Sequence, residues 1–366
     1  MTDRIAVIGG GSGGKALAAD MALQGKRVRL FEFPEFRANV EAIMRSGRLR
    51  AVGAVEGEAA LDCVTCELAE AVSGAQVVMV CTQALAHERV ARELVPLVSP
   101  EQFVVLNPGS TCGSLEFARV FREAGLEEWP VLAETSTLTY GCRASADRVE
   151  VLLKVARVTY GTLPGSVAPT VGPELEALFP GLVRAANVLE AGLNNANPVI
   201  HPPIALLNAA RIENEGCRML FYRDGVSPAV ARCIRKLDRE RMALLGALGY
   251  RALSDPEACM QQGYAESTDY FECYARGSVF GGIAAPDTLD HRFYHEDIGV
   301  GLVMFCSLGR LLDVPTPACE AFVRLGSVIH DRDYAAEGAR TLASLGLGGL
   351  NVPELKQFLD TGRVPI

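Results

Sequence analysis

The sequence has no excess of positive charge and no long apolar run. Its 366 residues include 35 Lys and Arg against 44 Asp and Glu, which gives a formal net charge of −9. This balance argues against nucleic acid and anionic membranes as partners, because both would repel the chain. No uninterrupted apolar stretch reaches membrane-spanning length, and the apolar start is broken by glycines. We therefore expect neither a membrane helix nor a signal peptide.

The chain also lacks the paired cysteines of a disulfide framework or a zinc site. Its eleven cysteines are odd in number and scattered, and the one close pair, Cys63 and Cys66, has no second pair to complete a zinc site. A chain of this length does not need disulfides for stability. We expect reduced thiols, a reducing cytoplasm and no metal.

The length and the order of the segments predict two domains. A single core rarely organises 366 residues. In the first half, short apolar strands alternate with helical segments, which predicts right-handed crossovers and a parallel sheet. The predicted strands are residues 4–8, 27–33, 75–82 and 103–109; residues 131–143 continue the pattern, and 149–163 are β-rich.

The second half has helical spacing almost throughout, as in residues 227–249, with a serine–proline start and a glycine stop. The fold class is therefore α/β: a doubly wound parallel sheet in residues 1–190, followed by an all-α domain in residues 191–366. A cleft between two such domains is the expected binding site.

Residues Gly9 to Gly14 follow the first strand, open a helix and fit the pattern G-x-G-x-x-G. Gly9 would permit a tight turn, Gly11 the approach of a pyrophosphate, and Gly14 the packing of helix on strand. Amides at the helix start, including that of Ser12, would hold phosphates. Glu32 ends the second strand 18 residues later (32 − 14) and would bind ribose hydroxyls. This context predicts a Rossmann-type domain that binds NAD, with NADH preferred over NADPH.

His201 is one of only five histidines and lies in the segment NNANPVIHPP, residues 194–203. Pro202 biases His201 away from helical angles, and the Pro-Pro pair can open a helix. Asn197 also precedes a proline and can cap a short turn, on the same face as His201. By position alone, a role as a helix cap or as a packed ring explains His201 at least as well as a catalytic role does.

A second polar segment, HRFYHED, occupies residues 291–297 just before an apolar stretch. Acidic groups at a helix start suit the helix dipole, which is the structural interpretation. His291 and His295 are four apart, as metal ligands can be. The segment lacks an HExxH pattern and has Arg292 between the histidines, so we expect no metal there.

Along most of its length the chain resembles the opine dehydrogenases, the octopine/nopaline dehydrogenase family. The matching stretches, in the same order and spacing, are IGGGSGGKALAA, LNPGSTCGSLEF, AETSTLTYGCR, GLNNANPVIHPPIALLNAARIE, HRFYHEDIGVGLV, VPTP and EGARTLASLGL. The resemblance implies a Rossmann-type domain followed by an all-helical domain. It also implies that an amino acid α-amino group condenses with a 2-oxo acid, often pyruvate, and that NAD(P)H reduces the imine to a secondary amine dicarboxylate.

The resemblance further implies roles for individual residues. His201 matches the family's catalytic histidine and Asp297 its partner, which would orient the ring. A histidine suits the removal of a proton from an ammonium near pH 7. Arg292 would grip a substrate carboxylate with two hydrogen bonds. Asn197 would complete the catalytic set, and the implied cofactor contacts beyond the glycine loop are Thr82, Pro108 and Glu134.

Two alternatives remain open. A two-domain NAD(P)-dependent dehydrogenase of a small 2-hydroxy acid or alcohol shares this plan, as ketopantoate reductase-like and glycerol-3-phosphate dehydrogenase-like chains do, but usually has a lysine near the hydride. A non-catalytic nucleotide sensor would tolerate loss of His201 or Asp297. Phe280 stands where we expect a tyrosine, so the amino acid substrate stays undefined. Small-molecule substrates and a homodimer are expected.

Overall fold

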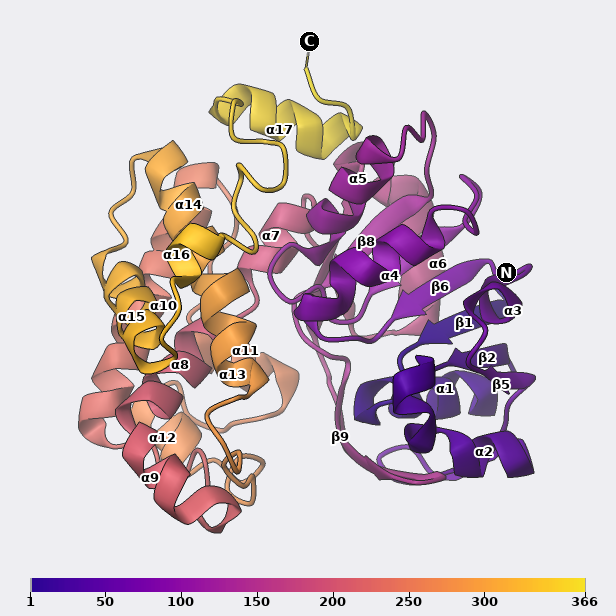
Figure 1. Cartoon of the computed structure of the whole chain (residues 1–366), viewed down its shortest axis with the longest axis horizontal. Coiled ribbons are helices and arrows are strands. Elements are labelled where there is room, and N and C mark those ends of the chain that lie inside the picture. Colours follow the sequence, from indigo (N-terminus) through magenta and orange to yellow (C-terminus); the bar gives the residue numbers. More distant parts are fainter. Residues whose placement is uncertain (1, 366) are drawn as a thin grey trace. The chain divides into compact units, whose positions relative to one another are not determined.

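The computed structural model describes residues 2–365, which form two compact units. The first unit ends at Gly192 and also includes Leu359–Arg363; the second begins at Leu193 and runs to Phe358. In Figure 1 the first unit is coloured mainly indigo to magenta and the second pink to yellow. Within the described part of the chain, no helix combines the length and the apolar character needed to cross a membrane.

The first unit is built on an eight-stranded sheet in the order β12-β11-β8-β7-β6-β1-β2-β5. Neighbouring strands are parallel, except that β8 and β11 are antiparallel. Strands such as β1 and β6 are apolar runs that are almost entirely buried, as is typical of parallel sheets covered on both faces. The predicted Rossmann-type architecture is therefore confirmed. The strands are β1 (Arg4–Ile8), β2 (Arg27–Phe31), β5 (Cys63–Thr65), β6 (Val77–Val80), β7 (Phe103–Leu106), β8 (Val131–Thr135), β11 (Val158–Leu163) and β12 (Leu182–Arg184).

A second, four-stranded sheet in the same unit was not predicted. Its order is β4 (Gly57–Ala60), β3 (Arg48–Gly53), β10 (Arg148–Lys154) and β9 (Tyr140–Ser145). Residues 131–143 therefore do not continue one pattern: β8 ends at Thr135, and β9 pairs with β10 in the second sheet. Buried and exposed residues alternate along β10, as expected for a sheet covered on one face.

Helix α1 (Ser12–Leu23) packs against strands of both sheets and is buried from Gly14 to Met21. This double contact explains its run of small residues, because alanines let both sheets approach the helix closely. The other helical segments of the first unit are η1 (Pro34–Asn39), α2 (Glu41–Ser46), α3 (Leu68–Val72), η2 (Ala84–Ala86), α4 (His87–Leu94), α5 (Gly113–Glu123), η3 (Gly165–Val167) and α6 (Ala168–Leu178), and α7 (Val188–Leu193) ends at the division.

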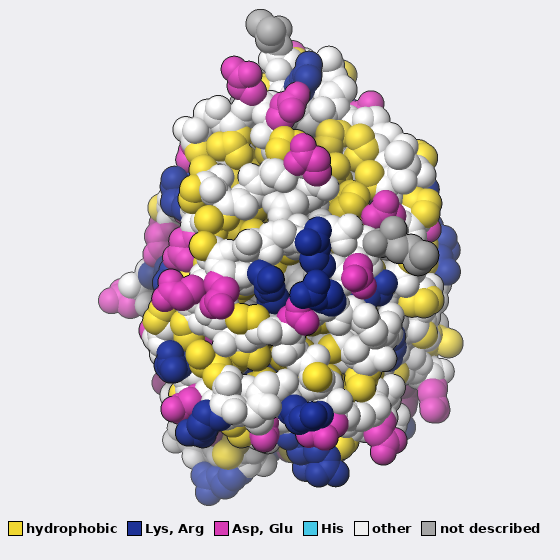
Figure 2. Space-filling model, turned by 90° about the vertical axis from the view of Figure 1, so that its right-hand side faces the viewer, with side chains coloured by type: hydrophobic (Ala, Val, Ile, Leu, Met, Phe, Trp, Pro, Cys, Tyr) yellow, Lys and Arg dark blue, Asp and Glu magenta, His cyan; other side chains and the backbone are white. Residues whose placement is uncertain are grey.

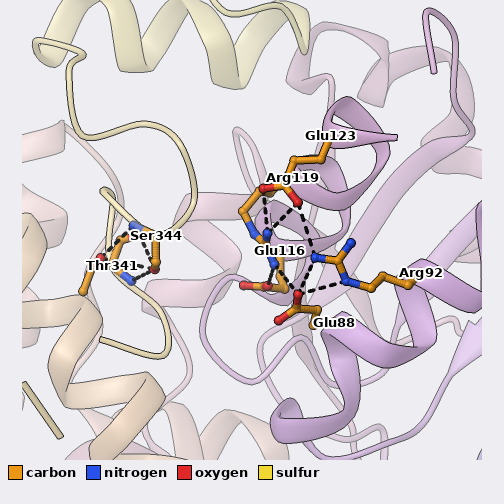
Figure 3. Close-up of polar contacts among 7 residues, drawn as sticks. All are labelled: Glu88, Arg92, Glu116, Arg119, Glu123, Thr341 and Ser344. Carbon is orange, nitrogen blue, oxygen red and sulfur yellow. Dashed lines mark hydrogen bonds and ion pairs between the residues drawn. The ribbon is translucent and has the colours of Figure 1, made fainter. Parts of the chain in front are cut away.

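An ion network joins α4 to α5 (Figure 3). Arg119 lies 3.2 Å from Glu88 and 2.7 Å from Glu123, and it also pairs with Glu116. Arg92 lies 2.6 Å from Glu88 and 3.4 Å from Glu123. The side chain of Arg119 is only 13% exposed, so three carboxylates converge on one largely buried guanidinium.

The second unit is helical, as predicted. Its long helix α10 (Pro228–Leu248) begins after Ser227, whose side chain accepts a hydrogen bond from the Val230 amide, and ends at Gly249 with φ +77°. The other segments are α8 (Asn197–Leu207), α9 (Ala209–Glu215), η4 (Gly216–Arg218), α11 (Asp255–Gln262), α12 (Tyr270–Ala275), α13 (Arg292–His295), the π-helical η5 (Asp297–Leu302), α14 (Val303–Leu312), α15 (Pro317–Ile329), α16 (Tyr334–Glu337) and α17 (Val352–Thr361), which from Leu359 on is counted with the first unit.

Charged side chains of both signs share the surface. On the face shown in Figure 2, basic side chains gather near the centre, and acidic side chains lie beside and around them. One exposed pair of the first unit, Arg27 and Asp62, is separated by 2.9 Å. Neither sign of charge dominates the face in view.

Candidate active site

The glycine loop between β1 and α1 is tightly packed at two glycines and open at a third. Gly9 has φ +107°, and a Cβ there would lie 3.0 Å from the Cys81 carbonyl oxygen. A Cβ on Gly14 would lie 1.7 Å from the Gly9 carbonyl oxygen, whereas a Cβ on Gly11 would meet no atom within 4 Å. The first amides of a helix have no acceptor within the helix, and they attract anions. Open space at Gly11 in front of α1 therefore fits a bound pyrophosphate.

Two further predicted cofactor residues brace this loop. Glu32 follows β2 and is 5% exposed; its Oε2 accepts hydrogen bonds from the Gly10 amide at 3.2 Å and from Asn39 Nδ2 at 2.9 Å. The Ser12 hydroxyl accepts one from the Ala144 amide of β9 at 3.1 Å. Both side chains are thus already bonded to the protein, and Glu32 lies at the end of β2 where a ribose would be bound.

The remaining cofactor candidates follow or end strands β6, β7 and β8. Thr82 Oγ1 is buried and has no hydrogen-bond partner in the described residues, so it fits a polar ligand. Pro108 is half-buried after β7. Glu134 is completely buried, and its oxygens accept from the amides of Cys112 at 3.0 Å and Ser114 at 2.8 Å. Glu134 therefore braces the start of α5.

His201 lies inside helix α8, which continues through Pro202 and Pro203. The expectation that the prolines remove His201 from helical geometry is wrong. An internal proline deprives the carbonyl four residues earlier of its donor, which destabilises a helix. Burial compensates here, because α8 is packed against α10, α13, η5 and α15 and residues such as Val199 and Ile204 are fully buried.

Neither Asn195 nor Asn197 is the N-cap of α8; that position is Ala196, and it makes no side-chain capping bond. Asn195 Oδ1 accepts a hydrogen bond from the Asn197 amide at 3.1 Å, and no side-chain bond of Asn197 is present within the described chain. Asn197 is half-buried and lies one turn before His201, so the two share a side of the helix.

His201 and Asp297 form a buried pair. Nδ1 of His201 lies 2.7 Å from Oδ2 of Asp297, 96 positions later, and the two side chains are 4% and 1% exposed. The expected hydrogen bond is therefore present. On the other side of the ring, Nε2 lies 3.0 Å from the hydroxyl of Tyr222, and Phe293 packs on the ring with its centroid 4.1 Å away.

Burial shifts both pKa values of this pair. It lowers the pKa of His201 well below its usual range, assisted by the positive charge of Arg292. Burial also raises the pKa of Asp297 to about 7, with the same arginine opposing the shift. Below about pH 7 the pair therefore holds one titratable proton, and above it the ring is neutral and Asp297 is ionised.

Arg292 begins α13, five positions before Asp297 (297 − 292). Its side chain is 36% exposed, lies 3.7 Å from Glu296, and stacks over the Phe293 ring at 5.1 Å. This single long ion pair engages few of the five guanidinium donors, so the group can bind a carboxylate.

The two histidines of the same segment have structural contacts. His291 Nδ1 accepts from the Phe293 amide, which caps α13, and burial lowers the pKa of His291 to about 4. His295 lies 2.7 Å from the Tyr334 hydroxyl and 2.9 Å from Asp290. In the described chain, no cluster of three or more His, Cys, Asp or Glu side chains is arranged to hold a metal.

Tyr222 was not predicted from the sequence, and Phe280 was singled out only as a departure from the family pattern. Tyr222 contacts the histidine directly, and Phe280 packs on Tyr222 with ring centroids 4.7 Å apart. Neither contact follows a helical or strand period, so spacing carried no signal for them.

A sheet unit with a dinucleotide loop, joined to a helical unit with a buried His–Asp pair, defines a two-domain nicotinamide-dependent dehydrogenase. Residues 184–330 match the family described as NAD/NADP octopine/nopaline dehydrogenase, alpha-helical domain, and residues 4–110 match NAD-dependent glycerol-3-phosphate dehydrogenase N-terminus. Together with a relative that is 34% identical over 97% of the chain, the first match shows that the chain belongs to the octopine/nopaline dehydrogenase family and is an oxidoreductase.

Relatives span the whole chain. The opine dehydrogenase of Arthrobacter sp. (strain 1C) is 34% identical over 360 residues, which cover 97% of this chain and 98% of the relative. Vitopine synthase of Allorhizobium ampelinum is 28% identical and covers 95% and 96%. A solved octopine dehydrogenase in complex with NADH and agmatine shares the fold, with a TM-score of 0.79 at 19% identity over 100% and 99% of the chains.

Proposed function

We propose that the protein catalyses the NADH-dependent reductive condensation of an amino acid with a 2-oxo acid, such as pyruvate, and the reverse oxidation. The observation that carries the proposal is the hydrogen bond between Nδ1 of His201 and Oδ2 of Asp297, 2.7 Å long, with Arg292 on the adjoining helix α13. Complexes of octopine dehydrogenase with NADH and L-arginine, and with NADH and pyruvate, support the same substrate classes.

His201 acts as the base. An amino acid arrives as an ammonium and must lose a proton before its nitrogen attacks a carbonyl. With Asp297 bonded to Nδ1, the opposite nitrogen Nε2 carries the lone pair that takes this proton, and Asp297 stabilises the resulting cation. The low pKa of His201 keeps the ring neutral and ready to accept.

Arg292 binds a substrate carboxylate. The guanidinium is partly exposed and only loosely paired with Glu296, and its planar fork matches a carboxylate. Held in this way, the 2-oxo acid has a fixed orientation for attack by the amine. Asn197, one turn before His201, completes the polar set by hydrogen bonding to substrate.

The glycine loop, Glu32 and Thr82 would hold the cofactor, and bound NADH supplies the hydride. We infer a preference for NADH, because Glu32 is a carboxylate at the end of β2 and would repel a 2′-phosphate. A solved relative by fold, yersinopine dehydrogenase, has NADP+ bound, so this preference needs its own test. Comparable kcat/KM values for NADH and NADPH would contradict it.

The runner-up function is reduction of a 2-oxo acid alone. D-mandelate dehydrogenase in complex with NADH and anilino(oxo)acetate shares the fold with a TM-score of 0.60 at 15% identity. In addition, residues 4–110 match the N-terminal domain of NAD-dependent glycerol-3-phosphate dehydrogenase, an enzyme that also needs no amine. The two reactions differ in one requirement: only the condensation needs an amine.

The deciding experiment follows NADH oxidation with pyruvate, with and without each member of an amino acid panel, and weighs the product by mass spectrometry. Oxidation that depends on an amino acid, with a product containing both substrates, supports the proposal. Oxidation with pyruvate alone at the same rate would establish the runner-up. The proposal includes a homodimer, which light scattering tests directly.

A further inference from the structure

The hydroxyl of Tyr222 occupies the nitrogen of His201 that faces away from Asp297. It lies 3.0 Å from Nε2, while Asp297 lies 2.7 Å from Nδ1, so the imidazole is bonded at both nitrogens. The three side chains come from separate parts of the second unit: α8, the turn after η4, and η5. All three are at least nine-tenths buried.

We propose that Tyr222 is a positioning residue for the reaction, which sets the tautomer and the basicity of His201. This inference rests on the proposed function, in which His201 is the base. The Tyr222 hydroxyl donates to Nε2, so the ring proton stays on Nδ1 and the lone pair stays on the nitrogen that receives the substrate proton. When the ammonium of the amino acid arrives, it replaces the hydroxyl as donor, and its proton moves to Nε2.

The direction of these hydrogen bonds follows from the chemistry of the partners. Above about pH 7 Asp297 is ionised and only accepts, so Nδ1 is the donor to it and Nε2 is then an acceptor. Burial raises the pKa of Tyr222 well above its usual range, so the hydroxyl keeps its proton and can donate. A hydrogen bond donated to the neutral imidazole favours that form over the cation.

Packing fixes the Tyr222 ring in this position. Phe280 lies against it with centroids 4.7 Å apart, and Tyr274 stacks on it at 6.1 Å with an interplanar angle of 22°. The Tyr274 hydroxyl is buried and has no hydrogen-bond partner in the described chain. Tyr274 therefore offers a matched control: the same residue type in the same aromatic cluster, without the bond to His201.

Other charged and titratable groups act on this pair and must be kept constant in any comparison. Those that act on His201, besides Asp297, come from the segment before η5, and those that act on Tyr222 come partly from α11. They are Arg292, Glu296 and His291 for the histidine, and Arg292, Asp297, Cys259 and Asp255 for the tyrosine.

The test compares Tyr222→Phe with Tyr274→Phe, using the full-length protein with saturating NADH and 2-oxo acid. We expect Y222F to shift the acidic limb of kcat/KM for the amino acid upward by about 0.5 to 1 pH unit, the equivalent of one neutral hydrogen bond. Y274F should keep the wild-type pH profile. An unshifted limb in Y222F, or an equal shift in Y274F, would overturn the proposal.

A second measurement does not depend on turnover. Nitrogen NMR of protein labelled with ¹⁵N-histidine, recorded above about pH 7 where Asp297 is ionised, should show His201 as the Nδ1–H tautomer in wild type and Y274F. The resonances of His201 are assigned by their absence from the spectrum of His201→Gln. In Y222F the Nε2 resonance should lose its hydrogen-bond shift. An unchanged Nε2 resonance in a folded Y222F would also overturn the proposal.

His201→Gln separates this inference from the proposed function. If H201Q keeps wild-type activity, the proposed base is wrong, and the role of Tyr222 is wrong with it. If H201Q is inactive while Y222F has the wild-type pH profile, the base stands and only the role of Tyr222 is refuted.

Discussion

The backbone of Gly14 lies directly against the carbonyl oxygen of Gly9, so that a Cβ on Gly14 would lie 1.7 Å from that oxygen. This contact holds the start of α1 against the end of β1. Gly11, three residues earlier, has open space on the corresponding side. The two glycines therefore serve different purposes, one in packing and one in access.

Gly14→Ala should destabilise the protein by several kcal/mol, because the clash is with backbone and can be relieved only by moving the helix from the strand. Gly11→Ala is the matched control and should fold with a nearly unchanged Tm, but bind NADH at least about tenfold more weakly, roughly 1.4 kcal/mol. Thermal unfolding and fluorescence titration with NADH measure the two effects. Wild-type affinity in G11A would show that this loop does not approach the cofactor.

Asp297→Asn should keep the fold and reduce kcat. An asparagine can hold the ring in the wrong tautomer, with Nδ1 accepting. The loss should be smaller than the roughly 10⁴-fold seen for the equivalent change in a serine protease, because no covalent nucleophile must be activated. Circular dichroism checks the fold, and an unchanged kcat at all pH values would refute the role of Asp297.

The same variant tests how the pair holds its proton. Between about pH 4.5 and 6.5 the folded pair binds one proton, and the unfolded chain also binds one, on His201. The pair thus adds no pH dependence to the free energy of unfolding there. In D297N only the unfolded chain binds that proton, so stability relative to wild type should rise with pH, by up to about 1.4 kcal/mol per unit. Urea unfolding of both proteins at three pH values measures this. A difference in the free energy of unfolding that does not change with pH would contradict the prediction.

Arg292→Lys should weaken catalysis by about 1.5 to 3 kcal/mol in kcat/KM for the 2-oxo acid, because lysine cannot form the bidentate pair with a carboxylate. NADH affinity should not change, which makes cofactor titration the internal control. An equal kcat/KM for the oxo acid in R292K and wild type would place the carboxylate elsewhere.

Arg119→Met should lower the free energy of unfolding by more than the ~1 kcal/mol typical of one exposed ion pair. Its loss removes the guanidinium that pairs with Glu88, Glu116 and Glu123, whereas Arg92 still pairs with Glu88 and Glu123. The matched control is Arg92→Met, since Arg92 is 53% exposed against 13% for Arg119. Unfolding in urea measures both variants without the ionic screening of guanidinium chloride. An equal loss in the free energy of unfolding in the two variants would show that Arg119 contributes no more than Arg92.

Local patterns accounted for what the sequence could predict. The strand at residues 4–8, the glycine loop and the helix after it depend on neighbours in the chain, and the structure has them at Arg4–Ile8 and Ser12–Leu23. The family resemblance brought His201 and Asp297 together across 96 positions, which no periodicity could do.

The rest depended on tertiary contacts. Pro202 inside α8 contradicts the local preference of proline, because burial on several sides outweighs the missing hydrogen bonds. The assignment of β9 to a second sheet was decided by pairing with β10 and by the cover of α1. Tyr222 reaches His201 from a turn whose sequence carries no sign of that contact.

Asp297 is the first residue of the π-helical segment η5, in which the Gly301 amide bonds to the Glu296 carbonyl five residues earlier at 3.0 Å. Such a turn contains one residue more than an α-helical turn and behaves as a single inserted residue. Since an α-helix rotates about 100° per residue, removing one residue from 298–302 would turn Asp297 away from His201 by that angle relative to α14. The alignment of Asp297 with His201 thus depends on the number of residues in this segment as well as on their identity.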